Sequence, residues 1–258
     1  MSKLFDSHAH LDDKRFDADR ETVINECLNE LAGVLNPGCD LPTSSVAVEL
    51  AQKYETIYAA VGFHPHEAQH MQAKDEDILA AWTKDKKVVA IGEIGLDYYY
   101  DHSPREVQKA VFVRQLDLAK QLDLPIIIHN RDAHGDILQT IKNEGKGIKG
   151  VFHCYSGSWE MAKELLKLGF YISFGGSLTF KNAVKTVEVA QKIPLDRVLL
   201  ETDSPYLTPE PFRGKRNNPC MVKYVAERLA KERNLDFAEI CSITTDNVYG
   251  LFEKIAKN

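Results

Sequence analysis

Two histidines near the beginning of the chain have a spacing that suits metal binding. His8 and His10 follow the apolar residues Leu4 and Phe5, which predict a short buried strand. Because side chains alternate between the two faces of a strand, both imidazoles point the same way, about 7 Å apart along the strand. Two imidazoles on one face can hold a cation, although a lone His-x-His pair is as readily two ordinary histidines.

Four later apolar runs end in residues of the same kind. The runs are 88–93, 125–129, 151–153 and 198–203, and they end in Glu93, His129, His153 and Asp203. If these runs are parallel strands of one barrel, their carboxyl ends meet at one rim, where barrel enzymes have their active sites. So many metal-binding side chains at one rim have no simple structural explanation.

The complete set is too large for one tetrahedral catalytic site, which uses three protein ligands and a water. It suits two cations about 3.5–4 Å apart that share a carboxylate. The predicted division gives His8, His10 and Asp203 to one ion and His129 and His153 to the other, with Glu93 as the bridge. Such ions acidify a shared water and polarise the bond under attack. Asp203 is then the candidate proton acceptor and later donor.

The elements that carry these residues alternate along the whole chain. The predicted strands begin at residue 3 and continue at 33–36, 56–62, 88–93, 125–129, 151–153, 171–174 and 198–203. Helical patterns separate them, one of which opens with a predicted capping box of Ser103, Pro104 and Glu106. Eight nearly all-apolar strands in about 250 residues predict a (β/α)₈ TIM barrel formed by residues 1–258 as one domain. A doubly wound open sheet is the alternative, weakened by the absence of Gly-x-Gly-x-x-Gly after the first strand.

Composition limits the class of protein further. The chain is 44% hydrophobic and 27% charged, as in soluble globular proteins, and no apolar run approaches the ~20 residues of a membrane helix. The five cysteines include no Cys-x-x-Cys pair and, with no apparent signal peptide, predict reduced thiols in a cytoplasmic protein. A net charge of −6 argues against a protein that coats duplex DNA.

Several motifs, in order along the chain, resemble the TatD family of metal-dependent deoxyribonucleases, within the amidohydrolase superfamily. They are Phe5-Asp6-Ser7-His8-Ala9-His10-Leu11-Asp12, Gly62-Phe63-His64-Pro65-His66, Gly92-Glu93-Ile94-Gly95-Leu96-Asp97-Tyr98, His129-Asn130-Arg131, Phe152-His153-Cys154-Tyr155-Ser156-Gly157 and Glu201-Thr202-Asp203-Ser204-Pro205-Tyr206-Leu207. The resemblance covers essentially the whole chain. It implies a phosphodiesterase acting on DNA, single-stranded or at frayed ends, from a 3′ end, with Mg²⁺ or another divalent cation. It also implies that Glu93 stands where many relatives carry a carboxylated lysine.

Other residues are candidates for contact with a phosphate substrate. The long segment after the eighth strand contains Arg213, Lys215 and Arg216, which could hold a nucleic-acid backbone or form an ordinary solvated loop. Arg131 is a further phosphate candidate, and His64 is a candidate for contact with substrate or leaving group.

Two carboxylates precede the predicted ligands by two residues. Asp6 and Glu201 share strand parity with His8 and Asp203, so both are expected to point into the barrel and orient the ligands. The other histidines, at 66, 70, 102 and 134, are expected to be ordinary surface residues.

The sequence therefore predicts a monomeric hydrolase with two divalent metal ions that cleaves phosphodiester bonds of DNA. Histidine-rich sites prefer Zn²⁺ or Mn²⁺ over Mg²⁺, so the identity of the metal stays open. One alternative is a two-metal hydrolase of an ester or amide, such as an aminoacyl-tRNA deacylase. Another is a catalytically silent metal-binding scaffold, against which the presence of Asp203 counts.

Overall fold

Eight parallel strands form a nearly closed barrel in the computed structural model, which describes residues 3–255. Each strand pairs with the next along the chain. The strands are β1 Phe5–Asp6, β2 Gly33–Pro37, β3 Ile57–Val61, β4 Val88–Asp97, β5 Ile126–Arg131, β6 Gly150–Phe152, β7 Tyr171–Phe174 and β8 Val198–Leu200. At the seam the Ser7 N–H donates to the Leu200 carbonyl over 3.0 Å. The predicted (β/α)₈ barrel is confirmed, and the doubly wound alternative is wrong.

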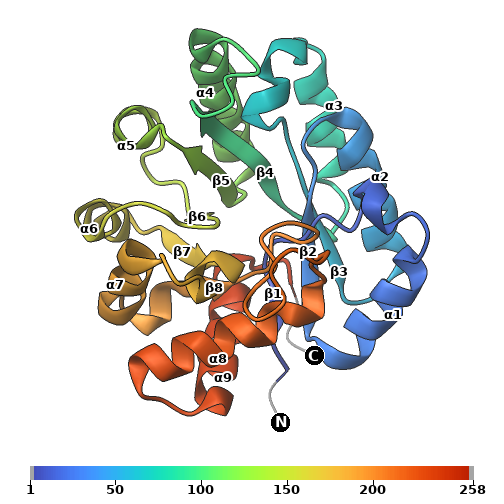
Figure 1. Cartoon of the computed structure of the whole chain (residues 1–258). Helices are drawn as coiled ribbons and strands as arrows, with labels where there is room; N and C mark the ends of the chain where they lie inside the picture. Colours follow the sequence, from blue (N-terminus) through green and yellow to red (C-terminus); the bar gives the residue numbers. More distant parts are fainter. Residues whose placement is uncertain (1–2, 256–258) are drawn as a thin grey trace.

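Helices cover the outside of the barrel, with one α-helix after each of the first seven strands and two, α8 and α9, after β8 (Figure 1). The α-helices are α1 Arg20–Glu30, α2 Leu41–Lys53, α3 Asp75–Trp82, α4 Arg105–Leu122, α5 His134–Glu144, α6 Trp159–Lys167, α7 Val184–Lys192, α8 Val222–Arg233 and α9 Phe237–Leu251. Short 3₁₀ turns are η1 Lys14–Phe16, η2 Pro65–His70, η3 Gly176–Thr179, η4 Leu195–Arg197 and η5 Pro219–Met221. None of the helices in the described range is both long and apolar enough to cross a membrane.

The beginning of α4 differs from the expected capping box. Pro104 is the N-cap residue and the helix begins at Arg105, so no side chain caps it. The Ser103 hydroxyl instead donates to the His66 carbonyl over 2.8 Å and accepts the Gln69 N–H over 3.1 Å. Ser103 therefore fastens the turn after β3 and does not cap α4.

The buried apolar side chains form two sets. The larger set lies between the strands and the helices, and the second fills the barrel interior, where α9 closes the amino-terminal end. The second set includes Phe5, Leu35, Ile127, Val151 and Leu199, packed with Val248, Leu251, Phe252 and Ile255. Full burial of each large apolar side chain contributes about 1.5–3 kcal/mol. The interior is thus a solid apolar plug below the rim.

The plug determines which residues reach the mouth of the barrel. Along a strand every second side chain points to the same face. Two residues beyond Ile127, Val151 and Leu199 lie His129, His153 and Glu201, so the inward positions change from apolar to polar at the carboxyl end. The polar side chains lie directly above the plug.

Candidate metal centre

Glu93 lies at the centre of the cluster of imidazoles. Its Oε2 atom is 3.3 Å from His8 Nε2 and 3.7 Å from His10 Nε2. Its Oε1 atom is 2.8 Å from both His129 Nδ1 and His153 Nε2. One carboxylate oxygen therefore faces the histidines that follow β1, and the other faces those of β5 and β6.

Asp203 joins the side of the cluster that contains the first two histidines. Its Oδ1 atom is 3.9 Å from His8 Nε2 and 3.7 Å from His10 Nε2. The eighth strand ends at Leu200, earlier than expected, and Asp203 has a left-handed φ of 55°. Its N–H donates to the His8 carbonyl over 2.9 Å, which fixes this turn against the end of β1. All six predicted ligand residues thus meet at one rim.

The donor atoms fit bound divalent cations. The Nε2 atoms of His8 and His10 lie 3.2 Å apart, and His129 Nδ1 lies 3.3 Å from His153 Nε2. Two imidazole nitrogens at such a distance can share one proton or turn their lone pairs to one cation. The ligand atoms of His8, His10 and Asp203 all lie within 4.8 Å of one another, as a shared ion requires. Imidazole and carboxylate donors together suit Zn²⁺ or Mn²⁺.

Electrostatics also favour cations here. In the described part of the chain, the ion pairs of Glu93, Asp97 and Asp203 are with histidines and not with lysine or arginine. Burial opposes ionisation of Glu93, but the surrounding imidazoles, His153 first, hold its pKa well below the usual range. Burial raises the pKa of Asp203, against the lowering effect of His8 and its neighbours. In the absence of a cation, Glu93 is therefore held ionised, whereas the neighbouring Asp203 accepts a proton more readily.

His64 has a hydrogen bond that determines which nitrogen carries its proton. Its Nδ1 atom accepts the His66 backbone N–H over 3.1 Å, so in the neutral ring the proton is on Nε2. Burial and the neighbouring His129 hold the pKa of His64 well below its usual range, so the ring is neutral. Its Nε2–H points to Glu93 Oε1 at 3.6 Å. A neutral donor beside the cluster agrees with the expected role in substrate contact.

Asp97 and His66 belong to the site, although the sequence reasoning assigned no role to Asp97 and a surface position to His66. Asp97 Oδ2 lies 3.0 Å from both His129 Nε2 and His66 Nε2. Its Oδ1 accepts the N–H groups of Tyr99 and Tyr100 over 3.0 and 2.9 Å. The prediction for His66 was wrong because the ring folds back from the loop onto β4. The sequence contained one signal for Asp97: it follows Glu93 by four residues, an even spacing that places both side chains on the same face of a strand.

Cys39 is another donor that the sequence reasoning left aside. It follows β2, and its sulfur lies within 4.8 Å of ligand atoms of His10 and Glu93. Burial raises the pKa of this thiol, and Glu93 and other nearby carboxylates raise it further. The side chain is therefore a neutral thiol next to the cluster in the absence of a cation.

The two expected supporting carboxylates behave differently. Glu201 points into the barrel as expected, with Oε1 3.3 Å from His153 Nδ1. Asp6 contacts no ligand imidazole: it accepts the His8 backbone N–H over 3.2 Å and the Thr202 hydroxyl over 2.6 Å. The first of these bonds forms an Asx turn that ends the strand alternation after Asp6, which explains why its parity prediction was wrong. Asp6 supports the backbone that carries His8.

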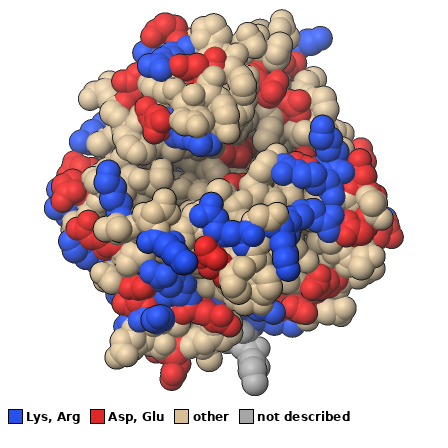
Figure 2. All heavy atoms as spheres, viewed as in Figure 1, with Lys and Arg blue, Asp and Glu red and all other residues tan. Residues whose placement is uncertain are grey.

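The expected phosphate-binding cations occupy different surroundings. Arg216 pairs with Asp19 over 2.5 Å and donates to the Arg15 carbonyl. Arg213 lies over the Phe180 ring, and neither it nor Lys215 has an acidic partner among the described residues. Figure 2 shows the molecule from the same side as Figure 1. A hollow lies near the centre of the face in view, with atoms of acidic residues at its bottom and basic side chains grouped along part of its edge.

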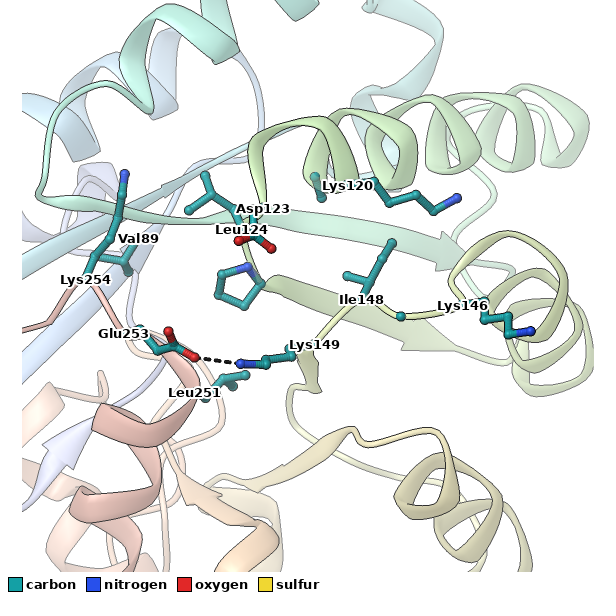
Figure 3. A pocket seen from close by; sticks show the side chains of 13 residues that line it. Val89, Lys120, Asp123, Leu124, Lys146, Ile148, Lys149, Leu251, Glu253 and Lys254 are labelled. Atoms are coloured by element: carbon teal, nitrogen blue, oxygen red, sulfur yellow. Dashed lines mark hydrogen bonds and ion pairs between the residues drawn. The ribbon is translucent and has the colours of Figure 1, made fainter.

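A second pocket lies at the opposite, amino-terminal end of the strands and lacks such chemistry. Its volume is about 260 Å³, and its lining includes Val89, Leu124, Lys149, Glu253 and Lys254 (Figure 3). Lys149 and Glu253 neutralise each other across 2.6 Å. The Lys254 ammonium donates to the carbonyls of Thr83 and Val88. These charged groups are paired with one another or with backbone carbonyls, which leaves the rim as the candidate site.

Comparisons with known proteins match nearly the whole chain. A family model described as TatD related DNase matches residues 5–253. YabD of Bacillus subtilis, named as an uncharacterized metal-dependent hydrolase, is 51% identical over 255 residues, covering 96% of this chain and 98% of the relative. A Citrobacter koseri protein named 3′-5′ ssDNA/RNA exonuclease TatD is 33% identical, with coverage of 96% and 98%. The crystal structure of YjjV, a TatD homolog from Escherichia coli K12, superposes with a TM-score of 0.90 at 32% identity and covers 98% of each chain.

Proposed function

The chain belongs to the TatD-related DNase family of metal-dependent hydrolases, and from this premise we propose that it hydrolyses phosphodiester bonds of single-stranded DNA from a 3′ end. We assign His8, His10 and Asp203 to one divalent ion and His129 and His153 to a second. Glu93 would serve as a ligand to both. The name of the Citrobacter koseri relative supports the choice of substrate.

One observation carries the proposal: Glu93 divides the imidazoles into two groups. The β1 side lies within 3.3–3.7 Å of Oε2, and the β5 and β6 histidines lie 2.8 Å from Oε1. A single structural zinc site has no use for a central carboxylate with both oxygens engaged in this way. Such an arrangement is typical of two-metal hydrolases.

The residues around this carboxylate have separate tasks. When bound, the divalent cations acidify a water and polarise the bond under attack. Asp203, which lies beside His8 and His10 at the rim, accepts the proton of the attacking water. His64 Nε2–H offers a hydrogen bond to a phosphoryl oxygen or the leaving group. Arg213 and Lys215 hold the nucleic-acid backbone from the loop after β8.

The decisive experiment compares substrates and metals on the same preparation. Protein treated with a chelator and then given Mg²⁺, Mn²⁺ or Zn²⁺ is incubated with single-stranded DNA labelled at the 5′ or the 3′ end. We expect cleavage only after metal is returned, with a 5′-labelled ladder that shortens from the 3′ end. Asp203→Asn should abolish cleavage. Hydrolysis of an ester or amide, such as an aminoacyl-tRNA, with intact DNA would refute the substrate but not the metal centre.

A further inference from the structure

Exposed aromatic side chains are concentrated at the rim that carries the metal centre. The large apolar side chains that are exposed in residues 3–255 are Tyr99, Tyr100, Val184, Tyr206, Leu207 and Phe237. Four of these six lie in the loops after β4 and β8. Exposure of 58% for Tyr99 and 50% for Tyr100 is unfavourable for rings that only pack. The concentration at one rim points to a ligand with flat apolar faces.

The loop after β4 forms a preorganised surface, which we call the tyrosine ledge: Tyr99, Tyr100 and Arg131. The two rings lie 4.8 Å apart at 90°, and the Arg131 guanidinium lies 4.1 Å from the Tyr99 ring centre and 4.8 Å from that of Tyr100. Both tyrosine N–H groups are held by Asp97, which also binds His129. One carboxylate thus positions the ledge relative to the metal centre.

A second aromatic side chain lies on the opposite side of the mouth. β4 and β8 are four strands apart in the eight-stranded barrel, so the loops that follow them face each other across the opening. After β8, the Tyr206 ring lies 6.3 Å from the His10 ring and carries the Arg15 guanidinium at 3.9 Å. The Tyr206 hydroxyl donates to Asp13, which fixes its orientation. The metal centre therefore lies between two aromatic surfaces, each with a stacked arginine.

We propose that the tyrosine ledge and Tyr206 stack unpaired nucleobases on either side of the scissile phosphodiester bond, so that the site selects single-stranded nucleic acid. This inference rests on the proposed function. Bases of a single strand have free faces that stack on aromatic rings and arginine planes, whereas bases inside a duplex do not. The arginines add a positive charge that suits the phosphate backbone between the stacked bases.

The test separates base stacking from chemistry. The holoenzyme and its variants hydrolyse two substrates, a single-stranded oligonucleotide and methyl 4-nitrophenyl phosphate, which has a phosphodiester bond but no nucleobase. Tyr99→Leu with Tyr100→Leu should raise KM for the oligonucleotide about tenfold to a hundredfold, the cost of one lost stack. Hydrolysis of methyl 4-nitrophenyl phosphate should change by less than about twofold. Tyr99→Phe with Tyr100→Phe keeps the rings and should resemble the wild type.

Two controls complete the design. Phe237→Leu removes an exposed ring at the beginning of α9 and should leave both reactions unchanged. Replacing bases beside the scissile bond with abasic sites should weaken the wild type but not the leucine pair, because both changes remove the same contact. The proposed role of the ledge is refuted if the leucine pair has the wild-type KM for the oligonucleotide. It is also refuted if hydrolysis of both substrates falls equally, because that result would indicate only a structural effect.

Failure of the proposed function gives a different result. If the wild type hydrolyses neither substrate, the phosphodiesterase activity is wrong. Fluorescence anisotropy of a labelled single strand then still decides whether the ledge stacks bases. Weaker binding by the leucine pair than by the phenylalanine pair supports this role, and equal binding overturns it.

Discussion

Replacing Asp97 with asparagine tests how the protein orients a metal ligand. Asp97 Oδ2 faces His129 Nε2 at 3.0 Å, and a carboxylate can only accept, so Nε2 carries the proton. The lone pair of His129 is thereby left on Nδ1, the atom that faces Glu93. In Asp97→Asn the amide oxygen stays with the backbone N–H groups of Tyr99 and Tyr100, because these need an acceptor. The NH₂ group then faces His129 and favours the opposite tautomer.

The size of this effect follows from the role of the hydrogen bond. Loss of an outer partner of a metal-bound histidine typically costs about 10–100-fold in metal affinity, or roughly 1.4–2.8 kcal/mol. Asp97 is fully buried, so water does not replace the lost bond. We therefore expect Asp97→Asn to bind its metal about 10–100-fold more weakly than the wild type, with little change in its fold.

The assay measures metal affinity directly. Metal-free protein is titrated with Zn²⁺ or Mn²⁺ in competition with a chelating dye, and circular dichroism verifies the fold. Asp136→Asn is the matched control, since it removes a carboxylate that binds the neighbouring Tyr98 hydroxyl over 2.7 Å but contacts no predicted ligand. Wild-type metal affinity in folded Asp97→Asn would refute the reasoning, and an equal loss in Asp136→Asn would assign the effect to the loop.

Three further perturbations test other parts of the protein. Glu93→Ala removes the bridge and should lower the metal content per chain, measured by elemental analysis, and abolish turnover; full activity would contradict the dinuclear assignment. Arg213→Ala with Lys215→Ala should raise KM for single-stranded DNA and reduce the slope of log affinity against log salt by about 1.4. Arg216→Ala, whose charge is already paired, should change that slope less; equal slopes in all variants would exclude this loop. Burial lowers the pKa of His134, so the unfolded chain binds its proton first and stability falls as the pH drops below about 6.5. In His134→Gln the free energy of unfolding, measured by urea denaturation, should depend less on pH in this range. If it falls between pH 7 and pH 5 by as much as in the wild type, the effect is excluded.

Much of the barrel and of the cluster at its rim was predictable from local patterns. Parallel strands covered on both faces must be apolar, which made the strands visible as short apolar runs. Alternation along a strand then placed His129, His153 and Glu201 above an apolar interior residue. The chemistry of the side chains at the strand ends pointed to divalent cations.

Only the tertiary structure decided which groups meet outside the strands. The sequence reasoning treated His66 as a surface residue and Asp6 as an inward one, and both outcomes depend on turns that bring a side chain back onto a neighbouring element. Likewise, the pairing of Arg216 with Asp19 joins residues almost 200 positions apart. Periodicity describes the direction of a side chain within one element, whereas its partner is set by how different elements pack. The sequence by itself therefore determined the barrel and the imidazoles and carboxylates that gather at its rim, and the packing of loops around the rim decided what supports them.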